Sequence, residues 1–325
     1  MKVLYAIQGT GNGHISRARA LVPELQKHCE LDVMISGTES EVTLPHPVKY
    51  NFRGFSFLYN RKGGINYTRS GVHNFSFRLL KEIWECPVKK YDLVINDFEP
   101  VSAWAARLRG TRLVAVGHQA SFASPNTPRP GRKDPMGEAV LRHYAPAERS
   151  IGLHFDRYDD FIFPPIIRPE VRRLKPVDRD FYLVYLPAMH DERLLEYLHK
   201  LYDVNFVVFS RYASYSYQDS NVRVRPIDSE AFAQALATCS GLLTGAGFET
   251  PAEALYLGKK LFVIPIKGQY EQHCNAAALN RMGIPGLSRI TRNLHEHLRE
   301  WIDSAAPYRV DYPDVTNQLI RAALG

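Results

Sequence analysis

A segment near the carboxyl end of the chain combines residue types that suit a phosphate and a ribose. It runs Thr244-Gly-Ala-Gly-Phe-Glu-Thr-Pro-Ala-Glu and reads as a strand end, a glycine turn and a helix. Gly245 and Gly247 let a ligand approach the backbone, and N–H groups at the start of the helix can bind phosphate. Glu253 lies about one and a half turns into that helix, where its carboxylate can accept hydrogen bonds from a ribose diol. The segment therefore predicts a nucleotide site.

A second polar pair follows the next predicted strand and a proline turn. Glu271 and Gln272 stand in the run Gly268-Gln-Tyr-Glu-Gln-His-Cys-Asn-Ala. A carboxylate and an amide supply the acceptors and donors that read sugar hydroxyls, so the pair predicts recognition of a sugar. The alternative is a plain βαβ unit whose glycines cap turns and whose Glu253 is a solvated helix residue.

A glycine loop also follows the first predicted strand and leads into a helix that begins near His14. The loop consists of Gly9, Thr10, Gly11, Asn12 and Gly13. Its spacing is G-x-G-x-G, and no acidic residue closes the second strand, which argues against a dinucleotide site. The positive end of the helix dipole favours a neutral imidazole at His14, which predicts a general base. A tight turn that merely needs small residues is the alternative.

Two carboxylates follow the predicted strand 92–96. Asp97 or Glu99 should lie at the carboxyl end of the sheet, where it can orient an imidazole or accept a proton. An acidic residue at this place can instead cap the helix that begins near Pro100. His118, at the end of the next strand, competes for the catalytic role or shapes the acceptor pocket.

Strand-like runs alternate with helix-like runs, which predicts α/β architecture with parallel sheets covered on both faces. The expected strands are 2–7, 31–36, 48–53, 92–96, 112–117, 181–186, 204–209, 221–224, 241–244 and 260–264. The expected helices of the second half are 190–200, 229–238, 249–257 and 269–282, with two more near the end. In the first helix, Pro23 should cause a kink or an early end.

The order of elements predicts two doubly wound, Rossmann-like domains that face each other across a cleft. The run 161–167, Phe-Ile-Phe-Pro-Pro-Ile-Ile, resembles a strand that leaves the first domain, and Pro164-Pro165 fixes an extended connector there. We therefore place the domains at 1–163 and 164–325, with the last helix able to pack back on the first domain. Between the first strands, the segment 55–78 is rich in aromatic and basic residues and resembles a mobile loop that stacks sugars or meets phosphate.

Composition narrows the class of function. The chain has 325 residues, of which 45% are hydrophobic and 23% charged, as in folded soluble proteins. A net charge of +7 favours an anionic partner, but the basic residues are dispersed and no nucleic-acid signature is present. The four scattered cysteines argue against disulfides and a zinc site, and the sequence shows no signal peptide or membrane-spanning stretch. We therefore expect a cytoplasmic protein that does not bind nucleic acid.

The region 222–283 resembles the donor-site signature of GT-B glycosyltransferases, and the nearest family is the peptidoglycan lipid-intermediate N-acetylglucosaminyltransferases and their relatives. The resemblance implies that the glycine turn contacts the donor phosphates, that Glu253 holds the ribose, and that Glu271 and Gln272 read the sugar. The turn comprises Gly245, Ala246, Gly247 and Phe248. The resemblance also places Ile227 against the base, and gives the first glycine loop, Gly9 to His14, a position that faces the acceptor and reaches the donor phosphate.

The chain departs from that family at 186–190, where a second glycine-rich loop is expected and Leu-Pro-Ala-Met-His is found. The resemblance implies an inverting glycosyltransferase that uses a UDP-linked sugar and an unknown glycan, lipid-linked or small-molecule acceptor. We expect no cofactor and no metal, and the resemblance allows peripheral contact with the inner face of a membrane. The alternatives are a sugar-nucleotide epimerase and a non-catalytic sugar-nucleotide-binding protein, since fold alone cannot separate them.

Overall fold

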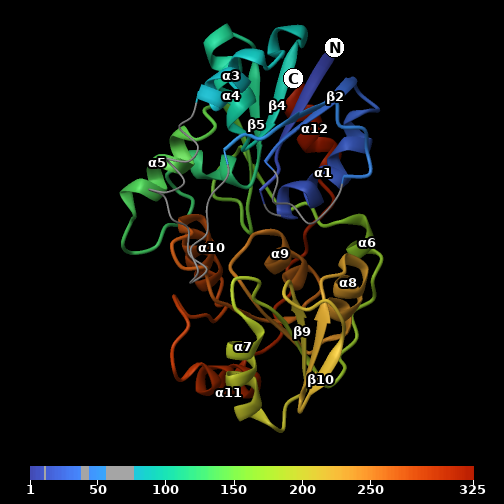
Figure 1. Cartoon of the computed structure of the whole chain (residues 1–325), viewed down its shortest axis with the longest axis vertical. Coiled ribbons are helices and arrows are strands. Elements are labelled where there is room, and N and C mark those ends of the chain that lie inside the picture. The colour runs from blue at the N-terminus through green and yellow to red at the C-terminus, as the bar shows by residue number, and fades with distance from the viewer. Residues whose placement is uncertain (11, 38–43, 56–76) are drawn as a thin grey trace. The chain divides into compact units, whose positions relative to one another are not determined.

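The computed structural model describes residues 1–10, 12–37, 44–55 and 77–325. These residues form two compact units (Figure 1). The first unit runs to Arg168 and also contains Pro313–Gly325, and the second is Pro169–Tyr312. The chain therefore passes between the units a few residues beyond the proline pair at 164–165. The loop predicted at 55–78 lies outside the described residues except at its ends.

The sheet of the first unit has the strand order β3-β2-β1-β4-β5-β6-β7, and every neighbouring pair is parallel. Its strands are β1 (Lys2–Gln8), β2 (Glu30–Ser36), β3 (Tyr50–Phe52), β4 (Leu93–Asp97), β5 (Leu113–Gly117), β6 (Arg149–Leu153) and β7 (Ile162–Phe163). The strand order reverses between β1 and β4. In a doubly wound sheet, ligands bind beyond the carboxyl ends of the strands at this switch point.

Helices cover both faces of this sheet because its strands are apolar on both sides. They are α1 (Asn12–Leu25), α3 (Phe77–Glu85), η1 (Val88–Lys90), α4 (Pro100–Arg109), η2 (Gln119–Ala123), α5 (Pro135–His143) and α12 (Thr316–Leu324). Helix α12 packs against α1 and β6, so the carboxyl-terminal helix belongs to the first unit.

Helix α1 continues through Pro23 and ends two residues later, at Leu25. The expected apolar face explains this result, because Ile15, Ala18 and Leu21 are buried and so are Val22 and Leu25 on either side of the proline. Burial of these side chains offsets the helix hydrogen bond that a proline cannot donate.

The sheet of the second unit has the order β10-β11-β9-β8-β12-β13, parallel except at the β10 edge. Its strands are β8 (Tyr182–Tyr185), β9 (Phe206–Ser210), β10 (Tyr217–Asp219), β11 (Val222–Pro226), β12 (Gly241–Thr244) and β13 (Lys260–Val263). Its helices are α6 (Pro169–Arg172), α7 (Asp191–Leu198), η3 (His199–Leu201), α8 (Ser229–Thr238), α9 (Glu249–Tyr256), α10 (Tyr270–Arg281) and α11 (Leu294–Ser304). Here the strand order reverses between β8 and β12.

All ten expected strands are present with small shifts at their ends, and the expected fold class of two Rossmann-like domains is confirmed as two such sheets. Strands β6 and β10 are additional. The strand expected at 161–167 is shorter, Ile162–Phe163, and it is the edge strand β7 of the first sheet rather than a strand that leaves the domain. No helix in the described part of the chain is long and apolar enough to cross a membrane.

Candidate active site

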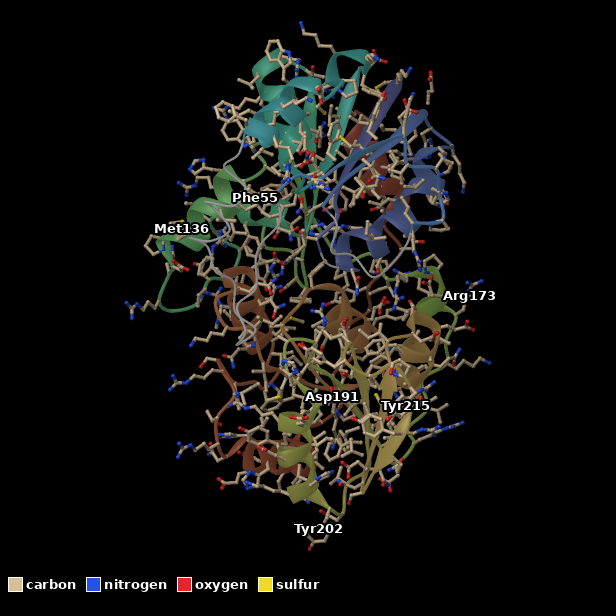
Figure 2. All side chains as sticks on the ribbon, in the orientation of Figure 1. Phe55, Met136, Arg173, Asp191, Tyr202 and Tyr215 are labelled. Carbon is tan, nitrogen blue, oxygen red and sulfur yellow. The ribbon has the colours of Figure 1, made fainter. Side chains whose placement is uncertain are left out.

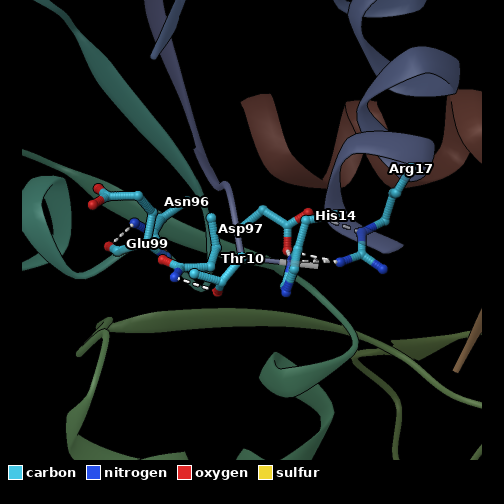
Figure 3. A network of polar contacts seen from close by, with 7 residues as sticks. Thr10, His14, Arg17, Asn96, Asp97 and Glu99 are labelled. Atoms are coloured by element: carbon cyan, nitrogen blue, oxygen red, sulfur yellow. Dashed lines mark hydrogen bonds and ion pairs between the residues drawn. The ribbon is translucent and has the colours of Figure 1, made fainter. Parts of the chain in front are cut away.

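At the switch point of the first sheet, a histidine meets a carboxylate. His14 lies in the first turn of α1, and Asp97 is the last residue of β4. The Nδ1 atom of His14 is 2.8 Å from Oδ1 of Asp97, and the Asp97 side chain is fully buried (Figure 3). The two residues are 83 positions apart in sequence, so the pairing of β1 with β4 is what brings them together.

A third residue, Arg17, completes this cluster and is one that the sequence analysis missed. Its Nε donates to Oδ2 of Asp97 at 3.0 Å and its Nη2 to Oδ1 at 2.8 Å, with only 3% of the side chain exposed. Burial alone would raise the pKa of Asp97, but the charge of Arg17, together with His14, lowers it to about 2. The available signal was the spacing, since residues three apart on a helix lie on the same face.

The ionised state of Asp97 determines which nitrogen of His14 carries the hydrogen. An ionised carboxylate only accepts hydrogen bonds, so Nδ1 of His14 donates to Oδ1 and Nε2 keeps its lone pair. A histidine oriented in this way by a carboxylate is the arrangement of a general base. The cluster can therefore remove a proton through Nε2.

The backbone around Asp97 adopts conformations that hold the carboxylate in place. Gly117, at the end of β5, has a φ of 152°, and a Cβ there would lie 2.7 Å from Oδ1 of Asp97. Phe98 has a left-handed φ of 53°, which is costly for a residue with a large side chain. Its ring packs 4.8 Å from that of Tyr144. Both departures from ordinary backbone geometry therefore occur beside the same carboxylate.

Glu99 caps a helix, which is the alternative role that the sequence left open for an acidic residue at this place. It is the N-cap of α4, and its carboxylate accepts hydrogen bonds from the backbone N–H groups of Val101 and Ser102, both at 2.6 Å. Its side chain also accepts from the hydroxyl of Ser36, and burial raises its pKa. The expectation that Glu99 supports His14 is corrected here, because Asp97 is the carboxylate that contacts the imidazole.

The first glycine loop lies beside this cluster, and its Gly11 is outside the described residues. Gly9 is required by packing, because a Cβ there would lie 2.8 Å from the carbonyl oxygen of Gly37. Thr10 accepts a hydrogen bond from the amide of Gln8 at 2.6 Å. Asn12 and Gly13 begin α1, immediately before His14.

His118 belongs to the packed interior of the first unit. Its side chain is buried, and its Nδ1 donates to the carbonyl of Leu153 at 2.9 Å. The ring packs edge-on against Phe122 and lies 5.0 Å from that of His154. Close by, a cavity of about 290 Å³ is lined by residues that include Phe98, Gly117, Gln119, Phe122 and Arg142.

The glycine turn of the second unit has free space around its glycines, whereas Gly9 in the first loop is tightly packed. It follows β12 and leads into α9, whose first turn has no side-chain cap. Apart from its chain neighbours, no described residue has an atom within 4 Å of the place where a Cβ on Gly247 would stand, and the nearest such atom at Gly245 is 3.5 Å away. Neither glycine has a positive φ, so the fold itself does not require glycine at either position. The backbone of this turn is therefore accessible to a ligand.

Helices α9 and α10 hold the other predicted donor residues near this turn. Glu253 is buried in α9, and Glu271 is half-buried in the first turn of α10. The side-chain oxygen of Gln272 accepts from the backbone N–H of Ile266 at 2.9 Å. Asn275, which the sequence analysis did not single out, is fully buried and donates to the carbonyl of Ala246 at 3.0 Å. It ties α10 to the glycine turn.

Ile227 and Phe248 also lie beyond the carboxyl ends of their strands. Ile227 directly follows β11 and is partly exposed, and Asp228 next to it caps α8. Phe248 is buried at the N-cap position of α9.

The segment 186–190, where a glycine loop was expected, forms a compact turn. Leu186 and Met189 pack into the core of the unit. Helix α7 then opens with the two carboxylates Asp191 and Glu192, the first of which is labelled in Figure 2. Asp191 accepts from the hydroxyl of Ser210. Negative charge at a helix start disfavours a phosphate. Helix α9 opens with one carboxylate, Glu249, and α7 with two, so α9 offers the better anion site of the two.

The chain does contain an Asp-x-Asp triplet, at 178–180, and it lies away from the carboxyl ends of the strands. Asp178 precedes β8 and pairs with the buried Nζ of Lys259 at 2.9 Å. Among the described residues, no three His, Cys, Asp or Glu side chains gather in a way that could hold a metal.

Solved structures with similar folds span nearly the whole chain. MurG of Acinetobacter baumannii is 16% identical, with a TM-score of 0.60 and 99% of each chain covered. Phytolacca americana UGT2, complexed with UDP-2fluoro-glucose and pterostilbene, is 15% identical, with a TM-score of 0.58, 99% of this chain and 93% of the other covered. A UDP-N-acetylglucosamine 2-epimerase is 14% identical, with a TM-score of 0.51 and coverage of 99% and 90%. At this identity the likeness concerns the fold, which is GT-B.

No curated protein matches the chain in sequence. The sequence model of one family does match, over residues 1–300, and that family is described as Glycosyl transferase family 1. Since this span covers most of the chain and includes both switch points, the protein belongs to the glycosyl transferase family 1.

Proposed function

We propose that the protein transfers a sugar from a nucleotide sugar, most simply a UDP-sugar, to an acceptor hydroxyl, with inversion and without a metal. The observation that carries the proposal is the His14–Asp97 pair, which leaves Nε2 as a base at the switch point of the first sheet. Membership of a glycosyltransferase family supports this reading of the pair.

The second unit would bind the nucleotide. The open turn from Gly245 to Phe248 and the uncapped start of α9 offer backbone N–H groups to a diphosphate, and Glu253 would accept hydrogen bonds from the ribose. Ile227 would pack against the base. UGT2 of P. americana was solved with a UDP-sugar in this same fold, which supports uridine as the base.

The sugar would be read from α10. Because the oxygen of Gln272 is engaged with Ile266, sugar recognition by this residue falls to its amide nitrogen, while Glu271 supplies an acceptor. Two carboxylates open α7 and one, Glu249, opens α9, so α7 is the less suited of the two helices to the diphosphate. We therefore assign the phosphate contacts to the α9 side.

The proposed reaction is a single displacement. The acceptor oxygen forms a bond to the anomeric carbon as the bond from that carbon to the phosphate oxygen breaks. The electron pair leaves with the nucleoside diphosphate, and the acceptor proton passes to Nε2 of His14. Backbone N–H groups and the α9 dipole would stabilise the departing charge without a metal.

The acceptor belongs to the first unit in this proposal. The loop from Gly9 to Gly13 and the cavity lined by Asp97, Gly117 and Gln119 are the features that would position it, whereas His118 does not line that cavity. A glycan, a lipid-linked sugar or a small molecule would each present the required hydroxyl.

We assign the protein to the cytoplasm, with contact to the inner face of a membrane through α3. Phe77, Leu80 and Trp84 are 94%, 65% and 79% exposed on one face of this helix, beside Lys81. Exposed aromatic side chains beside basic ones suit an anionic lipid surface. Trp84→Glu should reduce flotation with phosphatidylglycerol vesicles, whereas Tyr202→Glu, at an equally exposed aromatic of the second unit, should not. Equal flotation of both variants would remove this assignment.

The second candidate is a sugar-nucleotide epimerase, favoured by the similar fold of the 2-epimerase. Incubation with UDP-glucose or UDP-N-acetylglucosamine, with and without a panel of alcohol acceptors, separates the two. Transfer releases UDP only when an acceptor is present, and epimerisation changes the free donor without one. Ligand-dependent stabilisation with neither reaction would indicate a binding protein. The absence of any response to nucleotide sugars would end the proposal.

A further inference from the structure

Arg17 and His14 approach the same oxygen of Asp97. Oδ1 receives Nδ1 of His14 at 2.8 Å and Nη2 of Arg17 at 2.8 Å, and the two nitrogens are 3.1 Å apart (Figure 3). Because Asp97 is ionised, both nitrogens are donors, so the short distance between them reflects a shared acceptor. The guanidinium charge is thus held against the imidazole.

This arrangement changes what the carboxylate does to the base. In an isolated histidine–carboxylate pair, the negative charge favours the protonated ring. Here a positive charge lies nearly as close, at 3.1 Å from Nδ1. This charge is permanent, because a guanidinium does not lose its proton in proteins. The positive charge opposes protonation of the ring, while the bidentate contact fixes the plane of the carboxylate that orients it.

The elements packed around α1 carry other charged and titratable groups, and none of them is hydrogen-bonded or ion-paired to His14 among the described residues. These groups are Lys2 and Tyr5 of β1, Arg321 of α12, Arg19 of α1 itself, and Glu99, His118 and Tyr144 of neighbouring loops. Glu99 is committed to the start of α4, and His118 to the carbonyl of Leu153. Burial raises the pKa of Tyr144 well above its ordinary value, so its hydroxyl stays neutral. Among the residues that the structure describes, Arg17 and Asp97 are the charged groups that contact His14.

We propose that Arg17 is a positioning residue that fixes Asp97 and opposes protonation of His14, so that Nε2 of the imidazole is correctly oriented before each transfer. The proposal rests on the proposed function only in the role given to His14 as the base. Its electrostatic part concerns the protein without substrate.

The first experiment follows the ring of His14 directly. Carbon-13 and nitrogen-15 NMR of the imidazole, assigned with His14→Gln, gives the pH at which the ring takes up its proton in the unliganded protein. In Arg17→Met this pH should rise by about one to three pH units, the range for a charge at such a distance. In Arg17→Lys, which keeps a charge but not the planar fork, it should change much less. An unchanged pH in Arg17→Met overturns the proposal.

A second pair of variants covers a failure of Arg17→Met to fold, since that change leaves the Asp97 carboxylate buried without its guanidinium. Asp97→Asn and the double variant Arg17→Met/Asp97→Asn differ only in the arginine charge. The ring should take up its proton at a higher pH in the double variant. Equal values in the two proteins would overturn the proposal.

The third measurement is the pH–rate profile of sugar transfer. The low-pH limb should move to higher pH in Arg17→Met, and Arg17→Lys should recover its position. A merely structural arginine would lower the rate by the same factor at every pH, which would contradict the proposal. If the NMR shift is found but no protein transfers sugar, the proposed function fails while the inference about Arg17 stands.

Discussion

The ends of β1 and β4 in the first unit and the ends of β8 and β12 in the second are equivalent in topology, since each sheet reverses its strand order there. In the first unit this position is occupied by side chains that contact one another. Asp97 is fully buried there, and a Cβ on Gly9 or Gly117 would collide with neighbouring atoms. The second place is open, with empty space at Gly247 and an uncapped helix start. The same topology thus presents preorganised side chains in one unit and accessible backbone in the other.

The comparison explains why glycines at similar turns have different roles. Where a larger residue would collide with the protein itself, as at Gly9, the glycine is no evidence for a ligand. Where a larger residue would fit, as at Gly247, the glycine is better explained by a ligand that approaches the backbone. The predictions below test this division, beginning with the largest effect.

His14→Ala should lower turnover by about a hundredfold to ten-thousandfold, because positioned proton transfer has that value, while affinity for UDP stays the same. The measurements are the steady-state rate and calorimetry with UDP. His118→Ala is the matched control, as it removes a buried histidine of the same unit. Near-normal turnover in His14→Ala, with loss in His118→Ala, would move the base and reduce the first loop to substrate positioning.

Glu253→Ala should weaken UDP binding by about 2 kcal/mol, or about thirtyfold, through loss of charge-assisted hydrogen bonds to the ribose. Calorimetry checks the affinity, and thermal unfolding checks that the protein is folded. Glu196→Ala, at an exposed position of α7, serves as the control. Unchanged affinity in a folded Glu253→Ala protein would remove the ribose contact from α9.

Exchanging one glycine in each unit for alanine tests the division itself. Gly9→Ala should destabilise the protein by about 2 kcal/mol, because the new methyl group meets the carbonyl of Gly37 at 2.8 Å. Gly247→Ala should leave the melting temperature unchanged and weaken UDP binding, because the methyl group would occupy space that the diphosphate needs. Loss of stability in Gly247→Ala without loss of affinity would reverse the comparison.

Asp97 should make the stability of the first unit depend on acid pH. Its pKa in the folded protein is about 2, below the ordinary value of 3.8, so the carboxylate stabilises the folded state fully above about pH 4. This contribution, about 2 kcal/mol, is lost as the pH falls from 4 through 2. Asp97→Asn should flatten that part of the curve of unfolding free energy against pH. If the unfolding free energy of the variant falls with acid as steeply as that of the wild type, groups other than Asp97 cause the loss of stability.

Gln272→Ala should have the smallest effect, about 1 kcal/mol. It should weaken binding of an intact UDP-sugar and leave UDP itself nearly unaffected, since only the former presents hydroxyls to the amide. Competition calorimetry with the two ligands measures the difference. An equal loss for both would show that the residue acts by holding Ile266 and the turn after β13.

Much of the fold could be predicted from the sequence because the signals are local. Apolar runs mark the strands, and the helix after β12 follows from a glycine turn and the residues beside it. Strand β6 was missed because only two of the five residues in Arg149-Ser-Ile-Gly-Leu153 are apolar and large, and only pairing with β5 makes this segment a strand. The return of α12 to the first unit was left open, since it depends on contacts with α1 far away in the chain.

The sequence by itself determined that the chain has two glycine turns, a histidine after one and a glutamate after the other, because these patterns span fewer than a dozen residues. It left Asp97 and Glu99 as equal candidates, since both follow the same strand. The tertiary structure distinguishes the two residues. The backbone turns at Phe98, so that Glu99 caps α4 while Asp97 lies at the end of β4 and contacts His14 of α1. It also recruited Arg17, whose partner is 80 positions away. Contacts at that separation form only when the parallel strands pair, so no local pattern could specify them.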